Sequence, residues 1–215
     1  MKKVSKAAVI FLGLVTVLNY LPIILTVVYS FNKSKLTSVW EGFSLDWYKM
    51  LFNDGDIKKA LLNSIILAVL TCMLSLVIGV SAALAMRGKK LIFDDFISGF
   101  ASLPIMIPEI ILGMVFMAIF SYMNLPFGFV TMTIAHSSFC VPYIFLIVRA
   151  RLMGMDLSLE EAARDLGASE FETFRDVTLP YILPGIASGL LLSFAMSFDD
   201  VVISIFTTGP SVNTL

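Results

Sequence analysis

Three acidic residues stand inside or at the end of long uncharged stretches, where they are well placed to act on a ligand. Glu109 is the only charged residue between Phe96 and Val148, and Asp199 and Asp200 close another apolar run. An acid inside a bilayer costs about 2.5–3.5 kcal/mol on insertion scales unless it faces water or a partner. The Lys and Arg residues all lie near span ends or in loops, so no internal counter-ion is evident. Acids placed in this way suit an aqueous pathway for a cation.

The surroundings of these acids leave alternatives open. Pro104 and Pro108 precede Glu109, and each lacks an N–H and disturbs the preceding turn, so we expect a kink beside Glu109. The alternative is a neutral carboxyl, or one paired with a basic group on another subunit. Asp199 and Asp200 point about 100° apart on a helix, so at most one of them faces a pathway squarely. For this pair the alternative is a solvated helix end.

A few other residue types could carry chemistry. Trp47, in a predicted outer loop, could anchor at the lipid headgroups or offer its ring to an ammonium ion. His136, the single histidine, is expected to form an interhelical hydrogen bond rather than to bind a ligand. Cys72 and Cys140 are expected to pack inside spans, and the sequence offers no metal-ligand constellation. It contains no phosphate-binding loop and no nucleophile–base pair, so we expect no cofactor on this chain and no enzyme activity.

A polar segment late in the chain predicts two short helices. Ser158 followed by Glu161 has the pattern of a capping box, and Gly167 is placed to end that helix. Ser169 and Glu172 repeat the capping pattern for a second helix. A plain connector would need only a few residues, whereas this segment builds two capped helices with exposed aromatic side chains. The pattern favours docking to a cytoplasmic partner, and a polar connector with ordinary caps is the alternative.

Long uncharged stretches must position all of these residues, and they set the fold class. Of the 215 residues, 58% are hydrophobic and 14% are charged, with 15 Lys and Arg against 16 Asp and Glu. This composition excludes a disordered chain, argues against a soluble enzyme domain and gives no support to nucleic-acid binding. Because about 20 apolar residues cross a bilayer, we predict an all-α polytopic integral membrane protein with a single transmembrane domain over 1–215. The predicted spans are about 7–32, 60–86, 97–123, 129–148 and 178–203, with a cytoplasmic loop at 149–177.

The basic residues predict which ends of the spans face the cytoplasm. They gather at the N-terminus and in two loops: Lys2, Lys3, Lys6, Arg87, Lys89, Lys90, Arg149, Arg151, Arg164 and Arg175. The loop 33–59 holds five Lys, fewer than these ten, so the positive-inside rule puts the N-terminus in the cytoplasm. The first stretch is too long for a signal peptide and lacks a small-x-small cleavage site, so we expect an uncleaved span.

The predicted cytoplasmic loop carries a motif that resembles a known family. The motif is Glu161-Ala162-Ala163, then Gly167, then Val177-x-Leu179-Pro180. It is similar to the EAA motif of ABC-importer permease subunits, with Val177 where the family has Ile. In that family the loop forms coupling helices, which seat in a groove of the ATPase subunit and transmit its closure to the spans. The resemblance implies that Glu161 holds the fold of the loop or contacts the ATPase and that Gly167 allows the turn. The local pattern separately predicts that Pro180 limits the second helix.

Shorter matches extend the resemblance over nearly the whole chain. They are Gly42-Phe43, Trp47-Tyr48, Ser193-Phe194 through Asp199-Asp200-Val201-Val202, and Thr208-Gly209-Pro210. These look like the spermidine/putrescine branch of the permeases, which implies a type I ABC-importer permease fold. The branch associates acids at positions matching Glu109, Asp199 and Asp200 with substrate passage, and the surroundings of Trp47 also match. Such permeases usually have six spans, so we expect five of six here, with the chain ending before the last.

The resemblance also implies partners and a location. We expect a second permease subunit, a dimer of ATPase subunits that bind ATP and Mg, and an extracytoplasmic polyamine-binding protein. The whole would lie in the bacterial cytoplasmic membrane and work by alternating access. Two alternatives stay open: an ABC permease for another small solute, such as a metal ion, another amine or an organic anion, and an ATP-independent secondary carrier.

Overall fold

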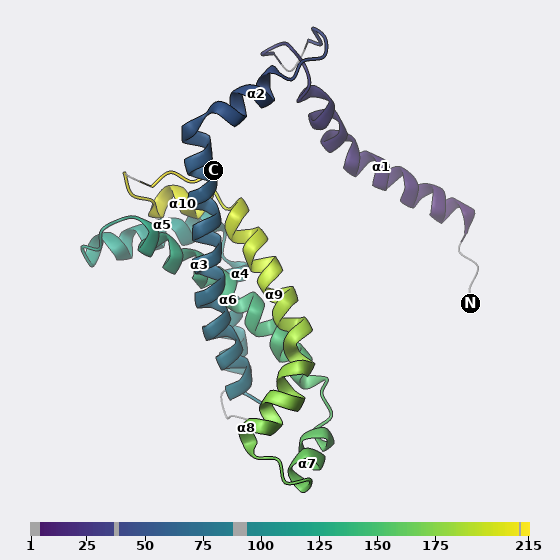
Figure 1. Cartoon of the computed structure of the whole chain (residues 1–215), viewed down its shortest axis with the longest axis vertical. Coiled ribbons are helices and arrows are strands. Elements are labelled where there is room, and N and C mark those ends of the chain that lie inside the picture. Colours follow the sequence, from purple (N-terminus) through teal and green to yellow (C-terminus); the bar gives the residue numbers. More distant parts are fainter. Residues whose placement is uncertain (1–4, 37–38, 88–93, 211) are drawn as a thin grey trace. The chain divides into compact units, whose positions relative to one another are not determined.

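The computed structural model describes residues 5–36, 39–87, 94–210 and 212–215. Within these ranges the chain is helical, and its only β contact is an isolated bridge between Asn32 and Phe43, which confirms the all-α class (Figure 1). Lys2, Lys3, Lys89 and Lys90, which carry part of the predicted orientation, lie outside the described residues. The helices are α1 (Lys6–Tyr29), α2 (Asp46–Asn53), α3 (Gly55–Ala85), α4 (Asp94–Met106), α5 (Glu109–Tyr122), α6 (Phe129–Met153), α7 (Ser158–Asp165), α8 (Glu170–Thr173), α9 (Leu179–Asp199) and α10 (Val202–Thr207), with a π-helix at Phe174–Thr178.

Four helical segments of the described chain are long and apolar enough to cross a membrane: α1, α3, α6 and the run Glu170–Asp199. The predicted span 97–123 differs from them, because α4 and α5 are bent by 105° where they meet. Pro108 stands directly before α5 and has no N–H with which to continue α4. The expected kink is therefore a complete break, and Glu109 is the first residue of the helix after it.

The chain divides into two compact units, residues 1–58 and residues 59–215. The first unit holds α1 and α2, and its connecting segment is organised by the buried side chain of Asn32. The Asn32 amide donates to the carbonyl of Val39 at 2.6 Å, and its oxygen accepts from the backbone N–H of Glu41 at 3.0 Å. One buried amide thus satisfies backbone groups of the loop beside the bridge that pairs Asn32 with Phe43.

Small residues allow the three long helices of the second unit to pack closely. Gly79 of α3 and Gly189 of α9 both lie against Ile144 of α6, which is fully buried. A Cβ atom on Gly79 would come within 3.0 Å of the Ile144 side chain, and one on Gly189 within 3.3 Å of its Cα. Helix packing inside a membrane depends on such close approach of backbones, so these glycines set the positions of α3 and α9 on α6.

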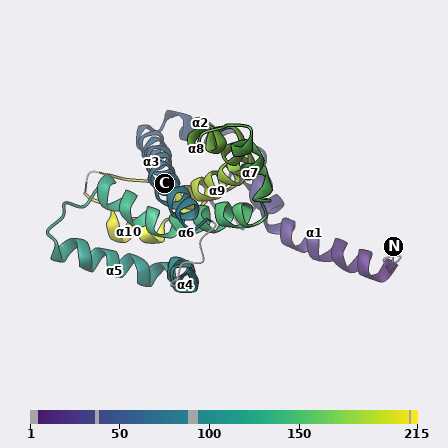
Figure 2. The ribbon, with the colours of Figure 1, turned by 90° about the horizontal axis from the view of Figure 1, so that it is seen from below.

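Two regions that carry the candidate residues lie at opposite ends of this second unit. Helix α9 runs between them and is about 30 Å long at 1.5 Å per residue. Helices α7 and α8 lie at one end, and α10 packs against α5 and α6 at the other (Figures 1 and 2). Gly113 permits the contact of α5 with α10, because a Cβ atom there would lie 2.6 Å from Cδ2 of Phe206. Residues 154–178 between α6 and α9 carry most of the EAA motif and are called the EAA loop. The fold therefore separates this loop from the acids at the end of α9.

Candidate functional site

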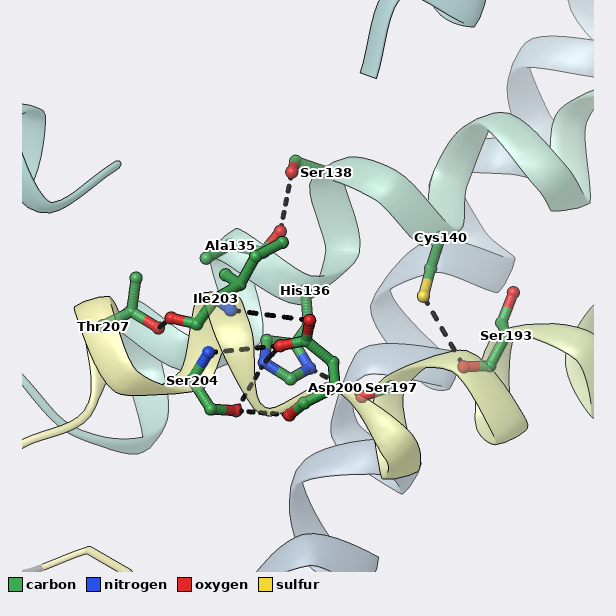
Figure 3. Close-up of polar contacts among 10 residues, drawn as sticks. All are labelled: Ala135, His136, Ser138, Cys140, Ser193, Ser197, Asp200, Ile203, Ser204 and Thr207. Carbon is green, nitrogen blue, oxygen red and sulfur yellow. Dashed lines mark hydrogen bonds and ion pairs between the residues drawn. The ribbon is translucent and has the colours of Figure 1, made fainter. Parts of the chain in front are cut away.

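A buried polar cluster joins α6 to the break between α9 and α10. His136 of α6 is fully buried, and its two ring nitrogens lie 2.9 Å from Oγ of Ser197 and 3.1 Å from Oγ of Ser204 (Figure 3). The Nε2 atom of His136 also lies 3.3 Å from Oδ2 of Asp200. The expected interhelical role of His136 is therefore confirmed, and its acidic partner is new.

Asp200 organises the first turn of α10. Its carboxylate accepts from the backbone N–H of Ser204 at 3.1 Å and from that of Ile203 at 3.5 Å (Figure 3). The hydroxyl of Ser204 donates to the backbone carbonyl of Asp200 at 3.0 Å. A carboxylate at a helix N-terminus satisfies N–H groups that have no partner within the helix. With only 4% of its side chain exposed, Asp200 is a buried structural residue in this conformation.

Asp199 and Glu109 have different surroundings from Asp200. Asp199 is the last residue of α9, Glu109 is the first residue of α5, and both are exposed. Their negative charges both act on Asp200, so the fold brings Glu109 close to two aspartates that follow it by 90 and 91 residues in the sequence. Two helix breaks meet here, and broken helices are tolerated at membrane depth where they line a water-filled cavity or protein. Of the two adjacent aspartates, Asp199 is the exposed one.

Trp47 belongs to the first unit, where it is held by a hydrogen bond. Its indole N–H donates to the backbone carbonyl of Asn32 at 3.0 Å, and 38% of the residue remains exposed. It lines a cavity of about 440 Å³ together with Lys35. A cationic lysine in the same cavity does not favour an ammonium ion there, so the cavity gives more support to an anchoring role for Trp47.

Both cysteines pack as expected. Cys72 of α3 and Cys140 of α6 are buried and unpaired. Each thiol donates to a backbone carbonyl of α9, Cys72 to Leu190 and Cys140 to Ser193, both at 3.6 Å. They add weak polar contacts to the three-helix packing, of which the one from Cys140 to Ser193 is drawn in Figure 3.

The EAA loop forms two helices, but only one of the two predicted capping boxes is present. The backbone N–H of Ser169 donates to Glu172 at 2.8 Å, and that of Glu172 donates to the Ser169 hydroxyl at 3.3 Å. These bonds from Ser169 hold the pKa of Glu172 below its usual value. The box predicted at Ser158 is wrong, because Ser158 lies inside the first turn and its N–H donates to Asp156 at 3.0 Å. This bond lowers the pKa of Asp156.

The structure also tests the predictions made for Gly167, at the turn of the loop, and for Pro180, just beyond its end. Gly167 follows α7 with φ +88°, a left-handed conformation that glycine adopts without steric cost, as predicted. Pro180 does not end the second helix, because α8 continues through the π-helix Phe174–Thr178 into α9. A proline at the second position of α9 lacks an N–H that would be unsatisfied at a helix start in any case. The loop is therefore joined to α9 by a continuous helical run, Glu170–Asp199.

The EAA residues lie mainly on the outside of the loop. Glu161 and Ala162 are exposed, and Ala163 is half-buried. Among the described residues, the side chain of Glu161 makes no hydrogen bond or ion pair, so it does not hold the loop as the resemblance allowed. That role belongs to Glu160, which pairs with Arg87 and accepts from Thr178. Leu179 is half-buried and Pro180 exposed at the start of α9.

Sequence reasoning missed three of these contributors: Arg87, Glu160 and the pairing of His136 with Asp200. Arg87 was counted only as a basic loop residue, and nothing in the local pattern distinguishes Glu160 from Glu161. The available signal was the helical face, since neighbours on a helix point about 100° apart and only one of two adjacent acids can face the spans.

Comparison with known proteins places this geometry in a family. Residues 75–215 match the family described as binding-protein-dependent transport system inner membrane component. The spermidine/putrescine transport system permease protein PotC of Escherichia coli (strain K12) is 37% identical over 196 residues, which cover 91% of this chain and 74% of that protein. The putrescine transport system permease protein PotI of the same strain is 36% identical over 203 residues, covering 91% of this chain and 72% of that protein.

A solved structure shares the fold. It is a crystal structure of a bacterial ABC transporter involved in the import of the acidic polysaccharide alginate, and it matches with a TM-score of 0.69 at 19% identity. The match covers 92% of this chain and 74% of that one. The helical architecture, the EAA motif and the named relatives all indicate the same family. The chain therefore belongs to the binding-protein-dependent transport system inner membrane components, as a multi-pass ABC-importer permease subunit and not an enzyme.

Proposed function

We propose that this permease subunit serves an ATP-driven importer that carries polyamines, spermidine or putrescine, across the bacterial cytoplasmic membrane by alternating access. It works with a second permease subunit, a dimer of ATPase subunits and an extracytoplasmic polyamine-binding protein. ATP and Mg bind to the ATPase subunits. Closure of the ATPases pushes the EAA loop and rearranges the spans, so that the pathway opens towards the binding protein.

The observation that supports a polyamine substrate is the pair of exposed carboxylates, Glu109 and Asp199, at two helix breaks. An exposed carboxylate at such a break can attract an ammonium group, and two of them can engage two ammonium groups of one polyamine. Relatives named as spermidine/putrescine and putrescine permeases, at 37% and 36% identity, support the same substrate class.

The observation that supports coupling is the continuity between the EAA loop and α9. The run Glu170–Asp199 is helical from the second loop helix to the exposed Asp199. A push on the loop therefore reaches the acid-bearing end of α9 without an intervening flexible link. The exposed Phe171 and Leu166 on the loop offer apolar surface to the ATPase.

The two ends of the second unit support the proposed orientation. Arg87 and the EAA loop share one end, and the loop contains Arg164 and Arg175. Basic residues favour the cytoplasmic side, so this end faces the ATPases and the acid-bearing end faces outward. With α1 crossing once before the first outer loop, the N-terminus lies in the cytoplasm.

The test is uptake by the complete importer reconstituted in lipid vesicles. We expect labelled spermidine and putrescine to accumulate only when ATP and the binding protein are present, with excess unlabelled metal ion or organic anion failing to compete. Uptake that proceeds without ATP would instead indicate a secondary carrier. Transport of the metal ion or the anion without polyamine uptake would assign the permease to another solute.

A further inference from the structure

A single arginine at the end of α3 contacts three segments between α6 and α9: the connection before α7, α7 itself and the π-helix. Arg87 stands two residues beyond α3, and one of its terminal nitrogens, Nη1, pairs with the Glu160 carboxylate and donates to Oγ1 of Thr178 at 3.0 Å. The other, Nη2, lies 3.2 Å from Sδ of Met155 in the connection between α6 and α7. The Thr178 hydroxyl donates to the same Glu160 carboxylate. We define Arg87, Glu160 and Thr178 as the Arg87 clamp.

The clamp lies largely out of water. The side chains of Arg87 and Glu160 are each 14% exposed, and Thr178 is 1% exposed. Screening by solvent and salt is weak for such a pair, and its geometry is restrained by the hydroxyl that both charged groups share. Removal of one charge leaves the other buried and unpaired, which is strongly destabilising in proteins.

Each clamp residue stands where its segment can transmit movement. Glu160 lies in the first turn of α7, where the helix N-terminus also favours a carboxylate. Thr178 is the last residue of the π-helix that joins the loop to α9, and π-turns inside helices are frequent at functional sites. Arg87 brings the end of α3 to this junction.

The three spans are tied to the loop in different ways. Helix α9 is continuous with the loop, and α6 is joined to α7 by only four residues, Gly154–Leu157. Helix α3 has no such connection along the chain, because α4, α5 and α6 come between it and α7. Near Ala83 and Met86, α3 packs on α6 and α9 through apolar contacts. Such contacts fix the position of one helix along another less specifically than a charged, directional hydrogen bond does.

We propose that the Arg87 clamp is a positioning element that couples movement of the EAA loop to α3, so that α3 moves with α9 in each transport cycle. Arg87, Glu160 and Thr178 need not touch the substrate or ATP; they act through the helices they join. The inference rests on the proposed function, since it concerns how the importer converts ATPase closure into opening of the pathway.

Asp165 provides a matched control. Glu160 and Asp165 are acids of the same short helix, but Glu160 pairs with Arg87 and Asp165 is the exposed last residue of the helix. Loss of charge at Glu160 breaks the clamp, whereas loss of charge at Asp165 alters only the outer surface of the loop. A difference between the two variants therefore reports the clamp and not the loop charge.

The experiment measures ATP hydrolysis and labelled spermidine uptake in the same vesicles holding the complete importer. In Glu160→Gln we expect hydrolysis to persist and spermidine carried per ATP to fall about tenfold, in the usual range for coupling between sites. In Asp165→Asn we expect spermidine carried per ATP to stay at the unmodified value. An unchanged ratio in Glu160→Gln, or an equal fall in both variants, would overturn the inference.

Two further variants separate coupling from stability. Arg87→Leu combined with Glu160→Leu leaves no unpaired buried charge, so the complex should assemble but stay uncoupled. Arg87→Glu combined with Glu160→Arg restores an ion pair and should restore the ratio at least in part. Recovery of coupling in the apolar pair would show that the clamp serves folding alone. Absence of spermidine uptake by the unmodified importer would refute the proposed function instead, so the two failures are distinguishable.

Discussion

Nε2 of His136 lies 3.3 Å from Oδ2 of Asp200 inside the second unit, and this contact holds the α9–α10 break against α6. The same carboxylate binds the first turn of α10, and the same imidazole binds hydroxyls on both sides of the break. The contact therefore buries Asp200 and leaves Asp199 as the exposed acid at the end of α9. One buried pair thus decides which of two adjacent acids can face a solute.

Substitution of His136 tests this arrangement. We expect His136→Ala to lower the free energy of unfolding by about 1–3 kcal/mol, because Asp200 and Ser197 lose a buried partner. Thermal unfolding of the purified importer measures the change. Ser138→Ala is the matched control, because Ser138 lies on the same helix but donates to the Ala135 carbonyl of its own turn, at 2.6 Å. Equal stability of the two variants would show that His136 does not stabilise the buried polar cluster.

The turn of the EAA loop depends on the backbone of Gly167. A non-glycine residue in a left-handed conformation costs about 1–2 kcal/mol, and φ at Gly167 is +88°, so Gly167→Ala should loosen α7 and reduce uptake. Hydrogen exchange of residues 158–166 measures the loosening. Gly99→Ala, in α4 where an added Cβ atom meets no atom within 4 Å, should change neither exchange nor uptake. Normal protection of α7 in Gly167→Ala would contradict the expectation.

The end of the chain beyond α10 packs on the turn before α6. A Cβ atom on Gly209 would lie 2.1 Å from the carbonyl oxygen of Phe127, whereas one on Gly128 would meet no atom within 4 Å. Because the obstructing atom belongs to the backbone, Gly209→Ala should destabilise the protein by about 1–3 kcal/mol, as overpacking does. Gly128→Ala should have little effect on thermal unfolding. A lower thermal unfolding midpoint for Gly128→Ala than for Gly209→Ala would show that this turn does not contact Gly209.

The second loop helix should respond to acid. The bonds from Ser169 lower the pKa of Glu172 below its usual value of 4.5, so the ionised form stabilises the folded cap. This stabilisation is fully present above pH 4.5 and is lost as the pH falls through the lower, folded-state pKa. Hydrogen-exchange protection of the Ser169 and Glu172 amides, corrected for intrinsic rates, should fall over that range. Glu172→Gln should remove the pH dependence; its persistence in that variant would assign it to another group.

Local patterns in the sequence predict much of the helical frame and part of the loop. The apolar stretches correspond to the long helices, and Gly167 and the Ser169–Glu172 box act through neighbours within three residues. Pro108 predicts a disturbance, but its 105° angle depends on how α4 packs on α6 and α5 on α10. Local chemistry predicts that a helix will bend and leaves the direction to tertiary packing.

The contacts of the candidate site need information that no local pattern contains. His136 meets Asp200 across 64 residues of chain, as their positions in the sequence show. Arg87 meets Glu160 across 73 residues. Competing local signals also misled the prediction at Ser158, because Asp156 two residues earlier offers its carboxylate to the same helix start. Distant polar pairs decide which acid is structural and which is exposed.

Glu109 and Asp199 are proposed to attract a polycationic solute. Labelled spermidine uptake by the reconstituted importer tests this proposal in Glu109→Gln, Asp199→Asn and the double variant, with the exposed outer-loop Glu41→Gln as control. We predict that each single change lowers uptake about tenfold, equivalent to about 1.4 kcal/mol, that the double lowers it further, and that the control transports normally. Undiminished spermidine uptake by the assembled double variant would contradict the account.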